Sequence, residues 1–338
     1  MDADSSFLCT NLINIRYLTG FTGSNALVLV THDDVHLFTD ARYAIQAEQE
    51  TSSVTITIAN DLFRAVATKI SSEPFYIEGS DITVESFEKL KDLIPNQVLI
   101  SNNFVERLRV IKDQHEVAVI EQACEIATNA LTLVLHKLHV GQSEREVALI
   151  LNRTMVDLGA DDIAFETIVA AGANSAIPHH KPTERPITQG DLLKIDFGAK
   201  LQGYHSDCTR TFVMGKPHSW QQEIHEIVRG AQRTGREALH QDVPCSTVTD
   251  TVKSVFDDTN FGQYFTHGLG HGVGLEIHED PFLSQQSTDT LKSGTIVTIE
   301  PGVYLPNQGG VRIEDTVVIT PDGYRNLTVF DYDLIEIS

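Results

Sequence analysis

Between residues 111 and 338, a pair of predicted helices followed by a group of predicted strands occurs twice. Capping signals place the first pair of helices after Asp113 and Ser143, and the second pair after Ser219 and Ser246. The first group of strands is expected at 164–170 and 192–213, and the second at 295–299, 303–305 and 311–319. This order of elements predicts an α+β domain made of two similar halves, although no clear sequence repeat joins them.

Residues 1–110 show a different pattern, in which short strands alternate with helices. Apolar, β-rich runs bounded by turn residues predict strands at 26–30, 35–39, 54–58, 75–77 and 98–100. Helical spacing at 42–50 and 61–71 places helices between them. We therefore expect the 338 residues to form a smaller α/β domain, 1–110, followed by the α+β domain, 111–338.

The charge of the chain disfavours several classes of partner. Lys and Arg number 25 and Asp and Glu 47, a formal net charge of −22, which repels nucleic acid and anionic membrane surfaces. The N-terminal sequence MDADSSFLCTN lacks the basic and apolar regions of a signal peptide, and no run approaches the ~18 apolar residues of a membrane span. Four scattered cysteines suit a reducing compartment. These features predict a cytoplasmic protein with neither nucleic acid nor membrane as a partner.

Two aspartates occupy positions in or beside apolar strands. Asp196 lies inside LLKIDF, where a carboxylate is costly unless it is paired or bound to a metal. Asp207 lies on the next strand, in HSDCTRTF. A single buried aspartate more often caps a turn, but two on adjoining strands favour a binding site.

A glycine-rich segment, THGLGHGVGLEIHEDP, carries three histidines: His267, His271 and His278. Glycine allows the backbone to approach a ligand closely. One histidine would be unremarkable in a core, whereas three within twelve residues favour a functional cluster. The segment lacks both the H-E-x-x-H pattern of helical zinc peptidases and the G-K-[ST] ending of a phosphate-binding loop.

Two glutamates follow in the last group of strands. Glu300 ends an apolar strand before Pro301, and Glu314 lies beside Arg312, with which it could instead form an ordinary surface ion pair. Together with the two aspartates and a histidine, these residues suit two divalent ions bridged by carboxylates. Two ions are favoured over one, because four anionic ligands would over-neutralise a single dication.

The combination of D-F-G, S-D-C-T-R-T-F, H-G-L-G-H-G-V-G-L-E-I-H-E, I-E-P-G and R-I-E-D resembles the pita-bread metallopeptidases. Within them it looks like the proline-specific branch, aminopeptidase P and prolidase. The resemblance implies a C-terminal pita-bread (creatinase/aminopeptidase) fold, and N-I-R-Y-L-T-G-F-T-G-S-N with F-T-D-A-R-Y resembles the creatinase-like N-terminal domain of that branch. The first helix of that domain, about twenty residues long in the family, is expected either to be missing here or to precede a misassigned start codon.

The resemblance also implies the ligand roles. Asp196 would bind one metal ion, Asp207 and Glu314 would bridge the two ions, and His271 and Glu300 would complete the second site. Glu300 is also the implied proton shuttle. Manganese is the expected metal, with cobalt and zinc as alternatives, because carboxylate-rich sites with one histidine suit all three.

Four further residues are implied to contact substrate or ligands. His278 would steady the tetrahedral intermediate, His267 would line the substrate pocket, and Arg312 would orient the ligand carboxylates or the substrate end. In A-N-S-A-I-P-H-H, which resembles the family's S-A-x-P-H element, His179 would be another substrate-binding histidine. The neighbouring His180 is the alternative, and His179 is preferred because the family residue directly follows the proline.

The leading functional prediction is an Xaa-Pro aminopeptidase that acts on peptides with proline at the second position, and the resemblance implies a homodimer. A dedicated site is needed because the proline amide has no N–H and a fixed φ. The F-T-D-A-R-Y motif favours the aminopeptidase over the alternative, an Xaa-Pro dipeptidase. A methionine aminopeptidase, which has no α/β domain before its catalytic domain, and a non-enzymatic pita-bread binding module are less favoured alternatives.

Overall fold

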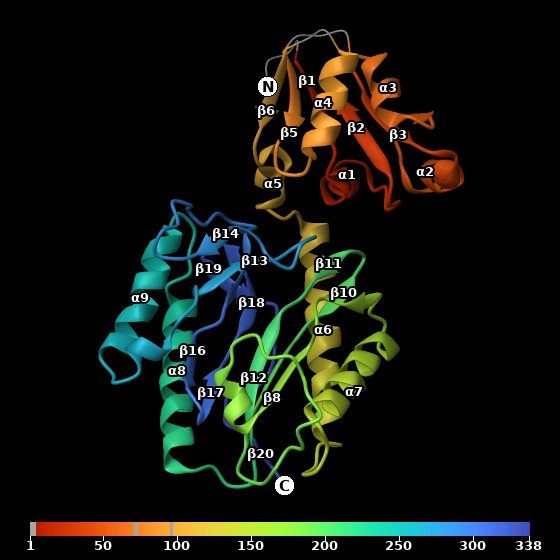
Figure 1. Cartoon of the computed structure of the whole chain (residues 1–338). Helices are drawn as coiled ribbons and strands as arrows, with labels where there is room; N and C mark the ends of the chain where they lie inside the picture. Colours follow the sequence, from red (N-terminus) through yellow and green to blue (C-terminus); the bar gives the residue numbers. More distant parts are fainter. Residues whose placement is uncertain (1–4, 71–73, 95–96) are drawn as a thin grey trace. The chain divides into compact units, whose positions relative to one another are not determined.

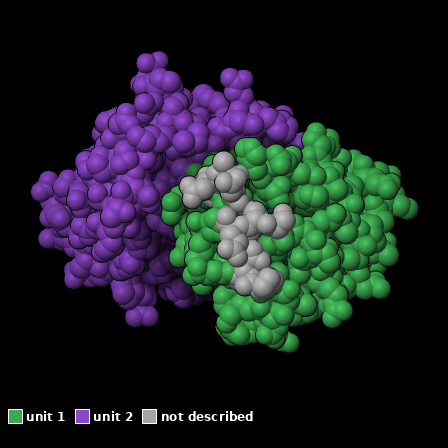
Figure 2. All heavy atoms as spheres, turned by 90° about the horizontal axis from the view of Figure 1, so that it is seen from above, with its two compact units in different colours: residues 1–109 green, residues 110–338 purple. Residues whose placement is uncertain are grey.

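The computed structural model describes residues 5–70, 74–94 and 97–338. The chain forms two compact units, Met1–Arg109 and Val110–Ser338, which are coloured separately in Figure 2. The expected absence of a helix before the first strand concerns residues that lie outside the described part of the chain.

Unit 1 is built around a mixed six-stranded sheet with the strand order β4-β3-β2-β1-β5-β6 (Figure 1). Its strands are β1 (Ser6–Cys9), β2 (Ala26–Val30), β3 (Val35–Thr39), β4 (Thr55–Ile58), β5 (Phe75–Glu78) and β6 (Val98–Ser101). Neighbouring residues of β1 point to opposite faces, so Phe7 and Leu8 belong to separate apolar clusters. The sheet is therefore covered on both faces, as an α/β pattern requires.

Five α-helices accompany this sheet among the described residues: α1 (Leu12–Thr19), α2 (Ala44–Glu50), α3 (Leu62–Ala67), α4 (Val84–Leu93) and α5 (Phe104–Arg109). The predicted helix at 42–50 begins as a short 3₁₀ turn at Ala41–Tyr43, and the helix predicted at 61–71 ends at Ala67. Helices α1, α4 and α5 were not predicted. The start of α4 could have been predicted, because Thr83 is a typical N-cap residue; in the structure its side chain accepts a hydrogen bond from Ser86 N.

Unit 2 contains the two predicted pairs of helices: α6 (Gln114–Leu135) with α7 (Glu144–Asp157), and α8 (Ser219–Glu237) with α9 (Cys245–Asp257). Complete capping boxes at Asp113 and Ser143 confirm the start of the first pair. Ser219 and Ser246 are not caps, because they are already the first residue of α8 and the second residue of α9. At the start of α8, the backbone N–H of His218 donates to Gln221 Oε1 instead (2.8 Å). Figure 1 shows the two pairs on opposite sides of the strands of this unit.

Helix α6 combines length with an apolar composition that would suit a membrane span. Half of that apolar stretch is buried inside the structure, which is typical of a core helix. Ile120 and Cys124 pack against β15 and β18, while Ala127 and Leu131 pack against α7 and the sheet formed by β8, β9 and β12.

The strands of unit 2 form two main sheets, with the orders β20-β12-β9-β8 and β14-β13-β15-β18-β19. Their strands are β8 (Ile168–Ala171), β9 (Leu192–Phe197), β12 (Cys208–Met214), β20 (Glu336–Ile337), β13 (Gly270–Gly272), β14 (Glu279–Leu283), β15 (Ile296–Ile299), β18 (Asp315–Thr320) and β19 (Gly323–Asn326). Smaller sheets join β7 (Asp162–Ile163), β10 (Ala199–Leu201) and β11 (Tyr204–His205), and β16 (Gly302–Leu305) with β17 (Gly309–Arg312).

Two predicted strands are interrupted in the structure, and acidic residues lie at or beside the interruptions. The range 192–213 breaks at Gly198 and at Gly203, whose φ of +82° forms the turn between β10 and β11. The range 311–319 breaks between β17 and β18, where Glu314 instead makes an isolated bridge to Thr209. The strand predicted at 164–170 is shorter, because β8 begins only at Ile168. The breaks give the chain the sharp turns that bring separate strands to one site.

Candidate metal centre

Asp196, Thr209 and Glu314 lie side by side across three adjoining segments of sheet. Asp196 on β9 pairs with Thr209 on β12, and the backbone N–H of Glu314 donates to Thr209 O (3.0 Å). Asp207 precedes Thr209 by two residues and therefore faces the same side. All three acidic side chains are buried. The two aspartates singled out in separate strands thus reach one site, with Glu314 beside them.

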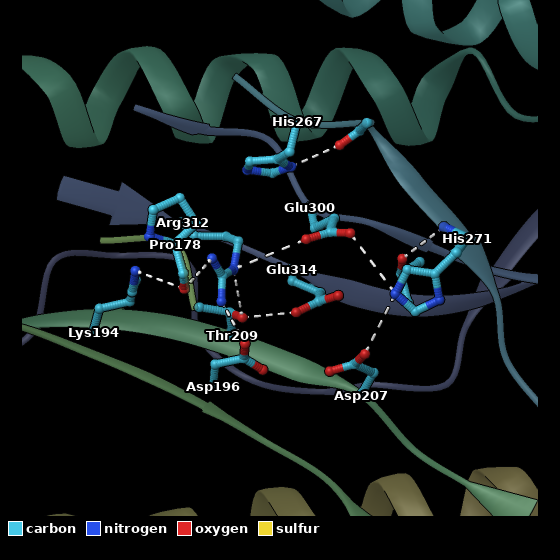
Figure 3. A network of polar contacts seen from close by, with 12 residues as sticks. Pro178, Lys194, Asp196, Asp207, Thr209, His267, His271, Glu300, Arg312 and Glu314 are labelled. Atoms are coloured by element: carbon cyan, nitrogen blue, oxygen red, sulfur yellow. Dashed lines mark hydrogen bonds and ion pairs between the residues drawn. The ribbon is translucent and has the colours of Figure 1, made fainter. Parts of the chain in front are cut away.

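His271 on β13 and Glu300 after β15 approach this row from the second main sheet (Figure 3). His271 Nε2 lies 3.6 Å from Asp207 Oδ2 and 3.7 Å from Glu300 Oε1. Its other ring nitrogen, Nδ1, contacts Gly272 O at 3.0 Å and must donate to that carbonyl. Burial lowers the pKa of His271 to about 4, so its Nε2 carries a free lone pair directed at the carboxylates.

The four carboxylates of the cluster carry more negative charge than the described residues around them neutralise. Burial, and then the charge of Glu314, raise the pKa of Asp207 and of Glu300 well above the usual range. Burial, followed by the charge of Asp196, raises the pKa of Glu314 to about 8. Asp196 Oδ1 and Asp207 Oδ1 are buried without a hydrogen-bond partner among the described residues.

A divalent cation would satisfy both the excess charge and the orphaned oxygens. Asp207, His271 and Glu314 each offer a ligand atom within 4.8 Å of the others. Carboxylate oxygens with one imidazole nitrogen form a donor set suited to manganese, cobalt or zinc. The residues present therefore fit the metal centre predicted from the sequence.

Arg312 supports this cluster from inside the protein. Its Nη2 donates to Asp196 Oδ2, and its Nε donates to Thr209 Oγ1 at 3.0 Å. Thr209 Oγ1 in turn donates to Glu314 Oε2 at 2.7 Å. Both Arg312 and Glu314 are buried, so the alternative of a surface ion pair between them is wrong. Arg312 orients two of the predicted ligands, one directly and one through Thr209.

Tyr304, which the sequence did not single out, links Arg312 to His267. Arg312 Nη1 donates to Tyr304 Oη at 2.8 Å, and Tyr304 Oη contacts His267 Nε2 at the same distance. His267 Nδ1 donates to Gly268 O (2.7 Å), so Nε2 accepts from the tyrosine. Burial, with Arg312 nearby, lowers the pKa of His267 to about 4. Tyr304 thus connects His267 to Arg312, and His267 is not among the described residues that line the cavity, whereas the sequence analysis expected it to line the substrate pocket.

The acidic cluster opens into a cavity of about 260 Å³. Its described wall consists of the five predicted ligands together with Phe165, Glu166, Ile168, His179, His180, Lys181, Ile277, His278 and Arg312. His278 is exposed, and its ring meets the edge of His271 with a centroid separation of 4.4 Å. Exposed His179 and His278 are therefore available to a ligand in this cavity.

The histidine pair at 179–180 divides into one exposed and one anchored side chain. His180 is buried, and its Nε2 lies 2.8 Å from Glu144 Oε2. His179 is exposed, as the preferred register expects. Lys194, a second residue that the sequence analysis missed, holds the preceding loop by donating to Ile177 O at 2.7 Å. A lysine within the apolar run LLKIDF was the signal that could have identified it.

Comparison with known proteins agrees with this geometry. Residues 118–321 match the sequence profile of Metallopeptidase family M24, and residues 3–111 match the Creatinase/Prolidase N-terminal domain. The chain belongs to metallopeptidase family M24. As an M24 peptidase it is a hydrolase, and the non-enzymatic alternative has no support.

Similar proteins carry names from the proline-specific branch of M24. The Xaa-Pro dipeptidase of Pyrococcus furiosus is 36% identical over 328 residues, covering 96% of this chain and 93% of that protein. A solved Xaa-Pro dipeptidase from Bacillus anthracis superposes with a TM-score of 0.96 at 34% identity, covering 98% of this chain and 94% of that one. The X-Pro aminopeptidase of Thermotoga maritima has a TM-score of 0.93 at 31% identity, covering 98% and 97%. The M24 pita-bread fold with a creatinase-type N-terminal domain is thereby confirmed.

Proposed function

We propose that this M24 peptidase is an Xaa-Pro dipeptidase that hydrolyses dipeptides ending in proline. The observation that carries the proposal is the near-complete alignment with the dipeptidases of Pyrococcus furiosus and Bacillus anthracis.

The aminopeptidase that the sequence analysis favoured becomes the second candidate. It keeps the support of the Thermotoga maritima structure. The motif F-T-D-A-R-Y, on which that preference rested, has a local role in unit 1: Asp40 pairs with Arg42 at 2.8 Å and accepts from Arg42 N at 2.9 Å. These contacts explain the aspartate of the motif by the local fold of unit 1, without reference to the substrate.

The catalytic proposal assigns the five ligands, Asp196, Asp207, His271, Glu300 and Glu314, to two divalent cations, manganese by preference and cobalt or zinc as alternatives. Such cations supply Lewis acidity at the scissile carbonyl and at the attacking water.

Protein groups around the ligands would handle protons and orientation. Glu300, whose side chain is 18% exposed, reaches the cavity and would carry the proton from the attacking water to the leaving proline nitrogen. His179 and His278 would hold the substrate from the cavity wall, and Arg312 would fix the position of Asp196. Because burial keeps His267 and His271 neutral at pH 7, neither adds positive charge that would weaken metal binding.

We further infer that the protein works in the cytoplasm as a homodimer. Four free, buried cysteines support a reducing compartment. The inference of a dimer rests on the resemblance alone. Light scattering at micromolar concentration would measure the oligomeric state.

Digestion of Ala-Pro and Ala-Pro-Ala side by side, with added manganese, tests the proposed specificity. We expect the dipeptide to be cleaved and the tripeptide to resist. Cleavage of Ala-Pro-Ala at a comparable rate would favour the aminopeptidase. Cleavage of Met-Ala-Ser without either proline peptide would favour a methionine aminopeptidase.

A further inference from the structure

A dipeptidase must bind the free carboxylate of the residue that follows the scissile bond. In the longer peptides cleaved by an aminopeptidase, a neutral peptide bond takes the place of this carboxylate. In an Xaa-Pro dipeptide, the free carboxylate lies three bonds beyond the scissile carbonyl carbon, within about 4 Å of it. The cavity that holds the scissile bond must therefore also receive this carboxylate. The five acidic residues of its wall, Glu166 and the four acidic ligands, repel such a group unless a cation lies near.

Lysine and arginine contribute two side chains to the described wall of the cavity, Arg312 and Lys181. Arg312 is only 2% exposed, and its nitrogens already donate to Asp196, Thr209 and Tyr304. Lys181 differs, because its side chain is 81% exposed and its ammonium pairs with Glu166 at 3.1 Å. An exposed ion pair of this kind is weak, so an incoming carboxylate can replace Glu166.

The backbone around Lys181 is held in place despite the exposure of its side chain. Buried Glu144 contacts His180 on one side and accepts hydrogen bonds from the N–H and hydroxyl of Thr183 on the other (3.0 and 2.7 Å). Along this segment His179 is exposed, His180 is buried and Lys181 is exposed again. Lys181 and His179 therefore lie on the same anchored segment, and both line the cavity.

We propose that Lys181 is the specificity-determining residue that binds the free carboxylate of the dipeptide's proline. When no substrate is bound, Lys181 forms its ion pair with Glu166 instead. This inference rests on the proposed dipeptidase function and deepens it. It predicts opposite effects for the two partners. Loss of Lys181 removes the attraction for the substrate carboxylate, whereas neutralising Glu166 removes its competitor.

The test compares Ala-Pro with Ala-prolinamide, in which a neutral amide replaces the carboxylate without changing the shape. The manganese-loaded full chain should show a KM for Ala-Pro about five- to twentyfold below that for Ala-prolinamide. Lys181→Met should abolish this difference by raising the KM of Ala-Pro alone. Lys181→Arg should preserve it, and Glu166→Gln should enlarge it.

Lys292→Met is the matched control, because Lys292 forms an exposed pair with Asp242 (2.6 Å) and does not line the cavity. It should leave both KM values unchanged. A Lys181→Met variant that keeps the wild-type ratio of the two KM values, or that raises both KM values equally, would overturn the assignment of Lys181. Failure of the proposed function would differ: the unaltered protein would then cleave Ala-Pro-Ala as readily as Ala-Pro, and this inference would fall with it.

Discussion

At the scale of single residues, the centre depends on contacts that orient groups already identifiable in the sequence. The carboxylates were recognisable because each stands in or beside an apolar strand, where an unpaired charge is costly. Tyr304 and Lys194 were not recognised, because their positions depend on how β9 and β16 approach each other. Lys194 lies 4.9 Å from the centre of the Tyr304 ring, a contact between residues 110 positions apart in the chain. Local sequence carries no information about such a pairing.

Tyr304→Phe tests the link between Arg312 and His267. The variant removes the acceptor of Arg312 Nη1 and the donor to His267 Nε2 while keeping the ring. We expect kcat/KM for Ala-Pro to fall about 10- to 100-fold, because a hydrogen bond to a charged group is lost, with the metal content per chain unchanged. Tyr324→Phe on β19 is the control. Wild-type kinetics in Tyr304→Phe would show that the tyrosine does not position Arg312.

At the scale of elements, helix starts were predicted better than short strands. The capping boxes of α6 and α7 are local patterns of four residues, so the sequence alone identifies them. The strand β13 has the sequence GHG, which lacks β propensity and forms because β14 and β15 pair with its backbone. The sequence analysis singled out the histidines of this segment but did not predict a strand there.

Glu144→Gln should release the segment that carries His179 and Lys181. Burial would raise the pKa of Glu144, but hydrogen bonds from Ala171 N and from neighbouring side chains lower it, so the carboxylate is ionised and accepts at both oxygens. An amide retains one acceptor oxygen. We expect the free energy of unfolding to fall by about 2–4 kcal/mol in denaturant titration and the KM for Ala-Pro to rise. Glu223→Gln on the exposed face of α8 serves as control; equal stability of both variants would contradict this account.

Helix α8 contains a buried histidine that makes stability depend on pH. Burial lowers the pKa of His225 to about 4, below the value of about 6.5 in an unfolded chain. The contribution of neutral His225 to the free energy of unfolding is therefore complete above pH 6.5 and is lost as the pH falls towards 4. Between pH 7.5 and 5 the wild type should lose about 2 kcal/mol more unfolding free energy than His225→Gln, measured by denaturant titration. Parallel pH profiles for the two proteins would contradict the prediction.

At the scale of the whole molecule, both halves of unit 2 contribute to the centre. Asp196 and Asp207 follow the first pair of helices, and His271, Glu300 and Glu314 follow the second. The order of elements predicted two similar halves, and the residues themselves indicated shared metal ligation. The distance between the halves could not be predicted, because it follows from packing among residues far apart in the sequence.

The central claim is that hydrolysis of an Xaa-Pro dipeptide requires the metal centre formed by these five residues. The most direct measurement is the rate of Ala-Pro hydrolysis as manganese is titrated into chelator-treated protein, with Asp207→Asn in parallel. We predict no turnover in the stripped protein, a rise to a plateau at two ions per chain, and no activity in the variant at any manganese concentration. Full turnover without metal, or near-wild-type turnover in Asp207→Asn, would contradict the account.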